Sequence, residues 1–142
     1  MRHADDVPSE GRLDPAALEA YLRDGAVCLR GLFSKAQIAD LAQGIEENLS
    51  DPSPLAQVAS DPDDPGWFFE DFCNWQVNDA YRRLIFESGV AGVAAQLMQS
   101  YEARLYHDHL LVKEPGTRQR TPWHQDQPYY NVDGRQNVSM WL

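Results

Sequence analysis

The stretch "HLLVKEPGTRQRTPWHQDQPYYNVDG", residues 109–134, carries the strongest structural signal in this sequence. Apolar residues alternate with period two over residues 102–117, up to a Pro-Gly pair, which predicts a β-strand followed by a turn. We expect a second extended segment to begin at Thr121, and Asp133-Gly134 predicts another turn. Residues 136–142 predict a third strand, so we expect antiparallel strands in the C-terminal part.

Within this stretch, His124 and Asp126 stand two residues apart. On a strand both side chains share one face, where they can offer a nitrogen and an oxygen to a single metal ion. Trp123 then faces the opposite way, and we expect it to pack into the core. A lone His-x-Asp pair also fits a simple surface hydrogen bond, because such pairs are common. A second, distant His would complete the facial triad of non-haem Fe(II) oxygenases.

Upstream, the sequence predicts a helix, a strand and another helix. Asp14-Pro15 is a typical helix start and Gly25 a typical helix end. The apolar run 26–31 favours a buried strand. Ser34 and Gln37 have the spacing of a capping box for the next helix.

The middle of the chain combines a loop, an aromatic segment and two helices. Residues 50–66 carry four prolines and four aspartates, which predicts a mobile loop without regular structure. The aromatic segment 67–75 fits either the core or the wall of a pocket. Residues 78–99 predict two helices with a break near Ser88-Gly89, the first capped by Asn78.

The composition limits the class of protein. The chain has 142 residues and a net charge of −10, which argues against nucleic acid as a partner. It contains no apolar run near 18 residues, so we expect no membrane insertion. Cys28 and Cys73 have apolar or aromatic neighbours, which favours two free, buried thiols in a reducing, cytoplasmic compartment over a disulfide. Residues 1–12 are polar, and we expect them to be disordered, with one domain over residues 13–142.

Residues 109–142 resemble the phytanoyl-CoA dioxygenase family of Fe(II)/2-oxoglutarate oxygenases. The resemblance rests on Lys113 with Pro115-Gly116, a variable loop, the Trp-His-x-Asp motif at 123–126, the pair Tyr129-Tyr130, and Trp141 in a later strand. The opening "DGAVCLRGLFSKAQIADL" (24–41) also resembles the start of the family domain. The resemblance covers about residues 14–142. It implies an α+β fold with a mainly β core, a double-stranded β-helix (jelly roll) behind N-terminal helices, of which this chain is the N-terminal portion.

The resemblance also implies cofactors and site residues. His124 and Asp126 are two ligands of Fe(II) and the catalytic centre, and Trp141 lies beside 2-oxoglutarate, the co-substrate. On the expected strand 105–113, the side chains of His107, His109 and Lys113 share one face, and with Thr121 behind them they are candidates for contacting 2-oxoglutarate. The two strand histidines also fit ordinary structural positions. The resemblance leaves open whether ascorbate also serves, as a reductant.

A second metal motif is weaker. His107-x-His109 followed by Glu114 has the spacing of a cupin metal motif. The glycines that flank that motif in cupins would fall at positions 101 and 121, which are Tyr101 and Thr121 here. The cupin motif is therefore disfavoured.

The resemblance implies a hydroxylase that uses O2 and a small-molecule substrate. Family relatives that halogenate lack the carboxylate ligand, which is present here as Asp126. The substrate is an unidentified small organic or lipid-like molecule, since "KEPGTRQR" is the only basic cluster that could receive the phosphates of CoA. The family's third ligand, a His, and its arginine for 2-oxoglutarate are expected beyond Leu142. The alternative is a non-catalytic remnant or binding protein of the same fold, and the oligomeric state stays open.

Overall fold

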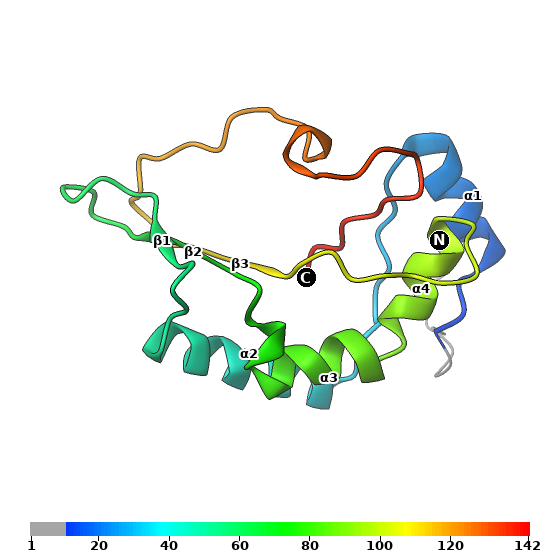
Figure 1. Cartoon of the computed structure of the whole chain (residues 1–142), viewed down its shortest axis with the longest axis horizontal. Coiled ribbons are helices and arrows are strands. Elements are labelled where there is room, and N and C mark those ends of the chain that lie inside the picture. The colour runs from blue at the N-terminus through cyan, green and yellow to red at the C-terminus, as the bar shows by residue number, and fades with distance from the viewer. Residues whose placement is uncertain (1–10) are drawn as a thin grey trace.

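The computed structural model describes residues 11–142 as helices beside a small antiparallel sheet (Figure 1). Its elements are, in order, α1 (Pro15–Asp24), α2 (Lys35–Ser50), β1 (Gln57–Val58), β2 (Phe68–Phe72), the 3-10 turn η1 (Asn74–Gln76), α3 (Asp79–Glu87), α4 (Val90–Leu97), β3 (His109–Lys113) and the 3-10 turn η2 (Gln127–Tyr129). The α+β class is confirmed. The described residues do not form a jelly roll, because that fold needs two packed sheets of about eight strands and this sheet has three.

The sheet has the order β1-β2-β3, and both pairs of strands are antiparallel. In β2 and β3, Phe68 lies opposite Lys113 and Phe72 opposite His109. The short β1 falls inside residues 50–66, so the expectation that this segment lacks all regular structure was wrong. Two of its residues are recruited as an edge strand by β2, while the prolines keep the rest irregular. The higher mobility of this loop stays a prediction.

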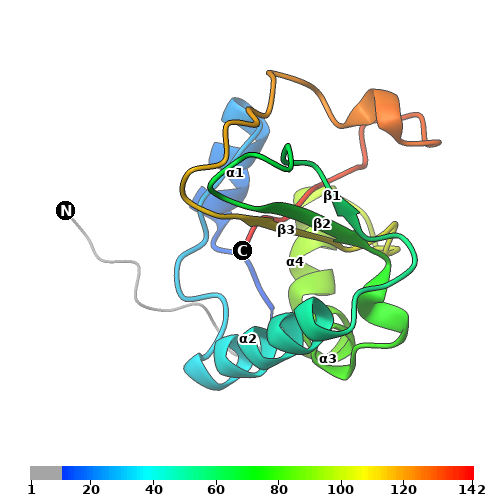
Figure 2. The ribbon, with the colours of Figure 1, turned by 90° about the vertical axis from the view of Figure 1, so that its left-hand side faces the viewer.

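The two faces of β2 serve different purposes. Phe69 and Asp71 are buried on the face that lies toward α2 and α3. By strand alternation, Glu70 and Phe72 lie on the opposite face. The chain after β3 passes over that opposite face (Figures 1 and 2). One face of the aromatic segment 67–75 therefore belongs to the core, and the opposite face lies under the chain that follows β3.

The helix ends follow the local signals in the sequence. The Asp14 side chain accepts a hydrogen bond from the Ala16 N–H (2.9 Å), and Gly25 ends α1 in the left-handed conformation. Ser34 and Gln37 form both hydrogen bonds of the capping box at α2. The predicted Asn78 cap and the break between α3 and α4 are also confirmed. These ends could be predicted because each depends on residues within one helical turn.

Three expectations about strands and cysteines were wrong. Residues 26–31 contain no strand, and Cys28 and Cys73 are free but exposed. A strand forms only beside a partner, and none of the described strands pairs with residues 26–31. Cys73 has a positive φ of 61° at the start of η1, a turn position that turns its side chain away from the core.

The chain entering α1 is held by α4. Gln96 donates its amide N–H to the Gly11 carbonyl (2.6 Å) and accepts from the Leu13 N–H (3.0 Å). Most of residues 1–12, for which we expected disorder, lie outside the described residues. None of the helices within residues 11–142 combines the length and the apolar character needed to cross a membrane.

A tight contact joins the loop before β2 to the turn after β3. The Asp64 side chain accepts a hydrogen bond from the Arg118 N–H (2.8 Å) and forms an ion pair with the Arg118 Nε (3.3 Å). Gly66 is buried against the backbone of this turn. The contact fixes the point from which the chain runs on toward His124.

Replacing Gly66 with alanine should lower the free energy of unfolding by about 1–3 kcal/mol, the usual cost of overpacking. The new Cβ would lie 2.4 Å from the Pro115 carbonyl oxygen and 2.5 Å from the Thr117 nitrogen. Urea unfolding measures the change. Gly92→Ala is the control, because its Cβ would meet the Gly11 oxygen at an ordinary 3.6 Å. A Gly66→Ala chain as stable as the unmodified chain would contradict this packing.

Candidate metal centre

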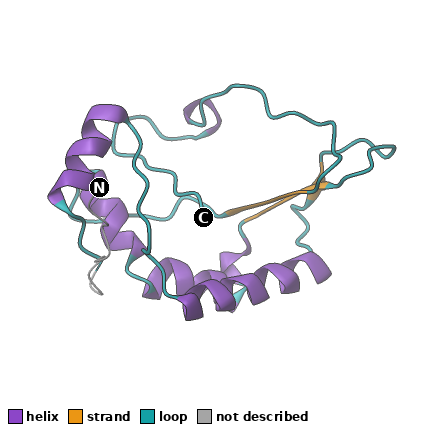
Figure 3. Ribbon diagram, turned by 180° about the vertical axis from the view of Figure 1, so that it is seen from behind, coloured by secondary structure: helices purple, strands orange, loops and turns teal. Residues whose placement is uncertain are grey.

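Asp126 is held by a single 3-10 turn rather than by a strand. The Tyr129 N–H donates to the Asp126 carbonyl (2.9 Å), and Pro128 lies within the turn η2. The extended segment expected from Thr121 and the strand expected over 136–142 are both absent (Figure 3). Neither segment pairs with the sheet, and a proline inside the turn favours compact backbone dihedrals over a strand.

The two predicted ligands nevertheless lie together. The Nε2 atom of His124 lies 3.2 Å from the Oδ1 atom of Asp126. The expectation that both side chains point to the same side is confirmed. The cause differs from the expected one, because residues 121–126 form no strand whose alternation could align the two side chains.

Each of the two side chains is oriented by a second contact. The Nδ1 atom of His124 lies 2.8 Å from the Pro122 carbonyl, which can only accept, so Nδ1 donates there. Nε2 is then the ring nitrogen that is free to bind a metal. On Asp126, Oδ2 accepts a hydrogen bond from the Ser139 hydroxyl (3.4 Å), and Oδ1 turns toward His124. A histidine that binds a metal usually donates its other ring N–H to a carbonyl or a carboxylate, as His124 does here.

The distance between the two donor atoms suits a shared ion. Two ligands at about 2.1 Å from one ion, at right angles, lie about 3 Å apart. The observed separation is 3.2 Å, and both side chains are partly exposed. Within residues 11–142, no third His, Cys, Asp or Glu joins the pair, and His107, His109 and Glu114 form no such group either.

An open pocket of about 470 Å³ surrounds this pair. It is lined by Thr121, Pro122, Trp123, His124, Asp126 and Trp141. Trp141 lines the same pocket as the predicted ligands His124 and Asp126, and its place beside 2-oxoglutarate stays a prediction. Trp123 is exposed, and its expected packing into the core was wrong. Because residues 121–126 are not a strand, no alternation turns Trp123 inward.

The turn η2 is docked on the start of β3 through aromatic side chains. The ring of Tyr130 lies 5.1 Å from the ring of Tyr106 and 5.7 Å from that of His107. The Asn131 N–H donates to the Tyr106 hydroxyl (3.2 Å). The Nδ1 atom of His107 is buried without a hydrogen-bond partner among the described residues. These contacts place His107 beside the segment that carries the predicted metal ligands.

The other two β3 candidates occupy different surroundings. His109 stacks on Phe72 with ring centres 4.0 Å apart, and burial lowers its pKa although the charges of Glu70 and Asp126 oppose the shift. Lys113, at the far end of β3, holds its ammonium 4.8 Å from the centre of the Phe68 ring. His107 precedes β3, so it does not share a strand face with Lys113 as expected.

A sequence model of the phytanoyl-CoA dioxygenase family (PhyH) matches residues 21–142. The chain belongs to this family. Members of the phytanoyl-CoA dioxygenase family depend on Fe(II) and 2-oxoglutarate, and the family implies a cupin-like fold. No curated protein and no solved structure matches the chain.

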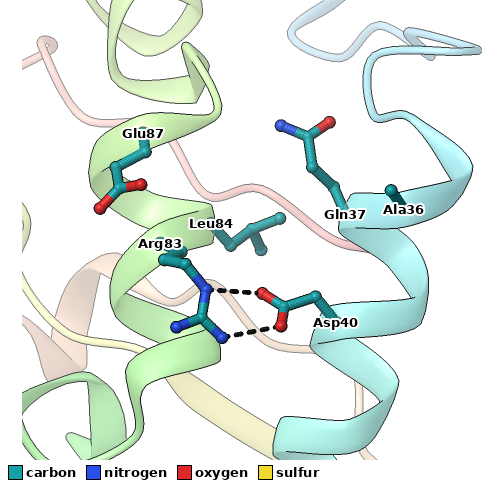
Figure 4. Close-up of a pocket in the computed structure, with 6 residues that line it drawn as sticks. All are labelled: Ala36, Gln37, Asp40, Arg83, Leu84 and Glu87. Atoms are coloured by element: carbon teal, nitrogen blue, oxygen red, sulfur yellow. Dashed lines mark hydrogen bonds and ion pairs between the residues drawn. The ribbon is translucent and has the colours of Figure 1, made fainter.

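A second pocket, of about 320 Å³, lies between α2 and α3 (Figure 4). Arg83 spans it and donates two hydrogen bonds to Asp40, at 2.9 Å from Nε and 2.7 Å from Nη2. Because the guanidinium is already engaged with a carboxylate, it is not free to bind an anionic ligand there.

Sequence reasoning missed three residues near the predicted site. The Pro122 carbonyl contacts His124, the Ser139 hydroxyl donates to Asp126, and Glu70 lies 4.0 Å from His109. Strand alternation within 67–75 could have identified Glu70, because it places one charged residue between two aromatic residues on the same face. The two orienting contacts depend on irregular backbone at Pro122 and Ser139, which no periodicity indicates.

Proposed function

We propose that this chain carries the iron-binding part of an Fe(II)/2-oxoglutarate-dependent hydroxylase that acts on a small organic or lipid-like substrate. The observation that carries the proposal is the His124–Asp126 pair. Its two donor atoms lie 3.2 Å apart, and the other polar atom of each side chain is occupied by a different partner. Family membership supports the same chemistry.

In this proposal, His124 and Asp126 hold the iron, and Thr121 and Trp141 line the same pocket. Bound Fe(II) and 2-oxoglutarate supply the activation of O2, with ascorbate as a supporting reductant. Pro122 fixes the tautomer of His124 through its carbonyl, so that Nε2 faces the pocket. Trp123 and Trp141 line the pocket with apolar rings, which are largely exposed to water.

For 2-oxoglutarate, we propose contacts from the histidines near the start of β3 and from Lys113. The buried, unpaired Nδ1 of His107 calls for a hydrogen-bond partner, and a carboxylate or carbonyl oxygen would supply one. Lys113 is a cation on the same sheet face as His109.

The nature of the substrate follows from charge. The one basic cluster of the sequence is partly neutralised, because Arg118 pairs with Asp64. Together with the net charge of −10, this argues against a CoA thioester, whose phosphates need cations. We keep the cytoplasm as the proposed location, since the chain holds two free cysteines.

A metal titration tests the proposal. Co(II), a spectroscopic substitute for Fe(II), should bind the chain, and His124→Ala or Asp126→Ala should weaken binding at least tenfold, because each removes one of two ligands. His109→Ala is the matched control and should leave the affinity unchanged. Loss of Co(II) binding in His109→Ala alone would favour the cupin motif and contradict the proposed centre.

A non-catalytic binding protein is the second candidate. It is favoured by one observation, that the described residues supply two metal donors where the facial triad needs three. Co(II) binding without any 2-oxoglutarate turnover in every form of the chain would support it.

A further inference from the structure

Strand β3 has one edge without a partner strand. The order of the sheet is β1-β2-β3, so β2 covers one side of β3 and none of the described strands covers the other (Figure 2). The opposite edge of the sheet is β1, which is only two residues long, whereas β3 has five residues. A longer open edge is a template for pairing with another chain.

The hydrogen bonds between β2 and β3 determine which backbone groups point to this open edge. The Glu114 N–H donates to the Trp67 carbonyl (2.8 Å) at one end, and the Cys73 N–H donates to the Asp108 carbonyl (3.1 Å) at the other. Such bonded pairs recur at every second residue, so the even-numbered residues of β3 bond to β2. The residues whose N–H and C=O groups point outward are His109, Leu111 and Lys113. None of these groups has a backbone partner among residues 11–142.

The open edge lacks the features that usually prevent such pairing, which include prolines and outward-pointing charges. The five residues of β3 contain no proline and no acidic residue, and Leu111 at the centre is 40% exposed. Lys113 lies at the end of the strand and holds its ammonium 4.8 Å from the centre of the Phe68 ring of its own sheet. A second copy of this acidic chain can therefore approach β3 without meeting a carboxylate on the strand itself.

The edge is also complementary to itself. Two β3 strands related by a twofold axis run antiparallel, with Leu111 opposite Leu111 and His109 opposite Lys113 of the second copy. In this register all outward groups find partners, in about six main-chain hydrogen bonds, three donated by each copy. A shifted register leaves some of these groups unpaired. Burial lowers the pKa of His109, so its ring is neutral at pH 7 and does not repel Lys113 of the second copy.

We infer that the open edge of β3 is an interaction surface whose partner is a second copy of this chain, paired strand to strand about Leu111. The three strands of each copy then join in one continuous sheet. The inference goes beyond the proposed function and does not depend on it, because it uses neither the metal pair nor its pocket. One short strand from each copy buries less than the about 1,200 Å² of a standard interface, so we expect a dissociation constant on the order of 100 µM.

The test is sedimentation velocity of the 142-residue chain at pH 7, with a chelator present so that no metal bridges two copies. We expect a monomer–dimer equilibrium between about 10 and about 500 µM. Leu111→Lys and Leu111→Glu should each weaken the dimer about tenfold, because each removes an apolar pair and places like charges opposite each other on the axis. An equimolar mixture of the two variants should dimerise again, since opposite charges then face each other. Leu22→Lys, at a leucine of α1 that is 54% exposed, is the matched control and should leave the dimer unchanged.

Amide hydrogen exchange on the unmodified chain is a second measurement that needs no variant. The amides of His109, Leu111 and Lys113 should exchange more slowly at about 500 µM than at about 20 µM, because the dimer covers them. The amides of Leu110 and Val112 bond to β2 in every copy and should exchange equally slowly at both concentrations.

Each outcome decides the inference. A chain that stays monomeric over the whole range would overturn it, as would a dimer that Leu111→Lys leaves intact. A mixture of Leu111→Lys and Leu111→Glu that stays monomeric would reject the twofold pairing about Leu111. If these variants do not fold, the exchange measurement decides alone, and equal rates for His109, Leu111 and Lys113 at the two concentrations would reject the surface. None of these results touches the hydroxylase proposal, which the Co(II) titration tests separately.

Discussion

Succinate release by the 142-residue chain, supplied with Fe(II), ascorbate, 2-oxoglutarate and O2, is expected to stay at background. In the proposed centre, His124 and Asp126 provide two protein ligands, and residues 11–142 hold no third His, Cys, Asp or Glu near them. A facial triad needs three protein ligands to hold iron with open positions. The pocket around the pair is also open to water, which competes with oxidation of a substrate. Iron binding itself should be weak but measurable.

A longer form of the chain gives the control. If the gene continues past codon 142 and encodes a His followed by an Arg, that form should release succinate, with the arginine pairing the far carboxylate of 2-oxoglutarate. His124→Ala in that form should reduce turnover by more than about 1000-fold, because the iron is lost. Ser139→Ala should reduce metal affinity by about tenfold or more, as loss of a contact behind a ligand does.

Robust, metal-dependent turnover by the 142-residue chain would contradict this prediction. It would mean that another residue completes the site, with His107 and His109 as the first to replace. It could also mean that a second copy of the chain supplies the third ligand. Turnover that survives His124→Ala would reject the proposed centre itself.

Local signals in the sequence predicted the helices well. The caps at Asp14, Ser34 and Asn78 and the break after Ser88 all depend on hydrogen bonds within a few residues. Such contacts form wherever the chain is helical, whatever surrounds it. The proline-rich segment was predicted as a loop for the same local reason.

Strands were predicted poorly, because a strand depends on a partner that is distant in sequence. Residues 26–31 and 136–142 have the composition of strands, yet neither pairs with the described sheet. Conversely, β1 has little strand character and exists because β2 offers it hydrogen bonds. The exposure of Cys28 and Trp123 follows, since the burial expected for both rested on strands that are absent.

The contact between His124 and Asp126 could be predicted, whereas the surroundings of Glu70 on the sheet could not. His124 and Asp126 are two residues apart, so almost any compact backbone keeps them close. The neighbours of Glu70 include Leu111 and His109, which come about 40 residues later in the chain. They meet Glu70 only through the register of β2 and β3. A pairing register is a global property, which the sequence around Glu70 does not contain.

Asp71 is the fully buried charge that joins the helices to the sheet. Its carboxylate accepts hydrogen bonds from the Asn48 side chain (2.8 Å), the Ser53 N–H (2.9 Å) and hydroxyl, and the Phe72 N–H (2.8 Å). Asn48 in turn accepts from the Tyr81 hydroxyl (3.0 Å), so α2, α3 and β2 meet in one network. These donors are buried or part-buried, so water has limited access to replace the carboxylate.

Asp71→Ala should therefore lower the free energy of unfolding by about 3–4 kcal/mol, since it leaves several buried donors without an acceptor. Urea unfolding followed by far-UV circular dichroism measures the loss. Asp61→Ala, which removes an exposed carboxylate from the loop before β2, should change stability by less than about 0.5 kcal/mol. A small effect at Asp71 would show that the network reorganises around the missing side chain.

The same carboxylate should make stability depend on pH in acid. Burial raises the pKa of Asp71, but the hydrogen bonds from Ser53, Asn48 and Asn74 outweigh it and lower the pKa from 3.8 to about 2. Because the folded pKa is the lower one, Asp71 stabilises the fold fully above about pH 4, and this contribution disappears as the pH falls toward 2. Its size is about 2.5 kcal/mol, at about 1.4 kcal/mol per pKa unit. Unfolding measured between pH 5 and pH 2 should show the loss in the unmodified chain and a shallower dependence in Asp71→Asn, and equal slopes for the two would contradict the role of Asp71.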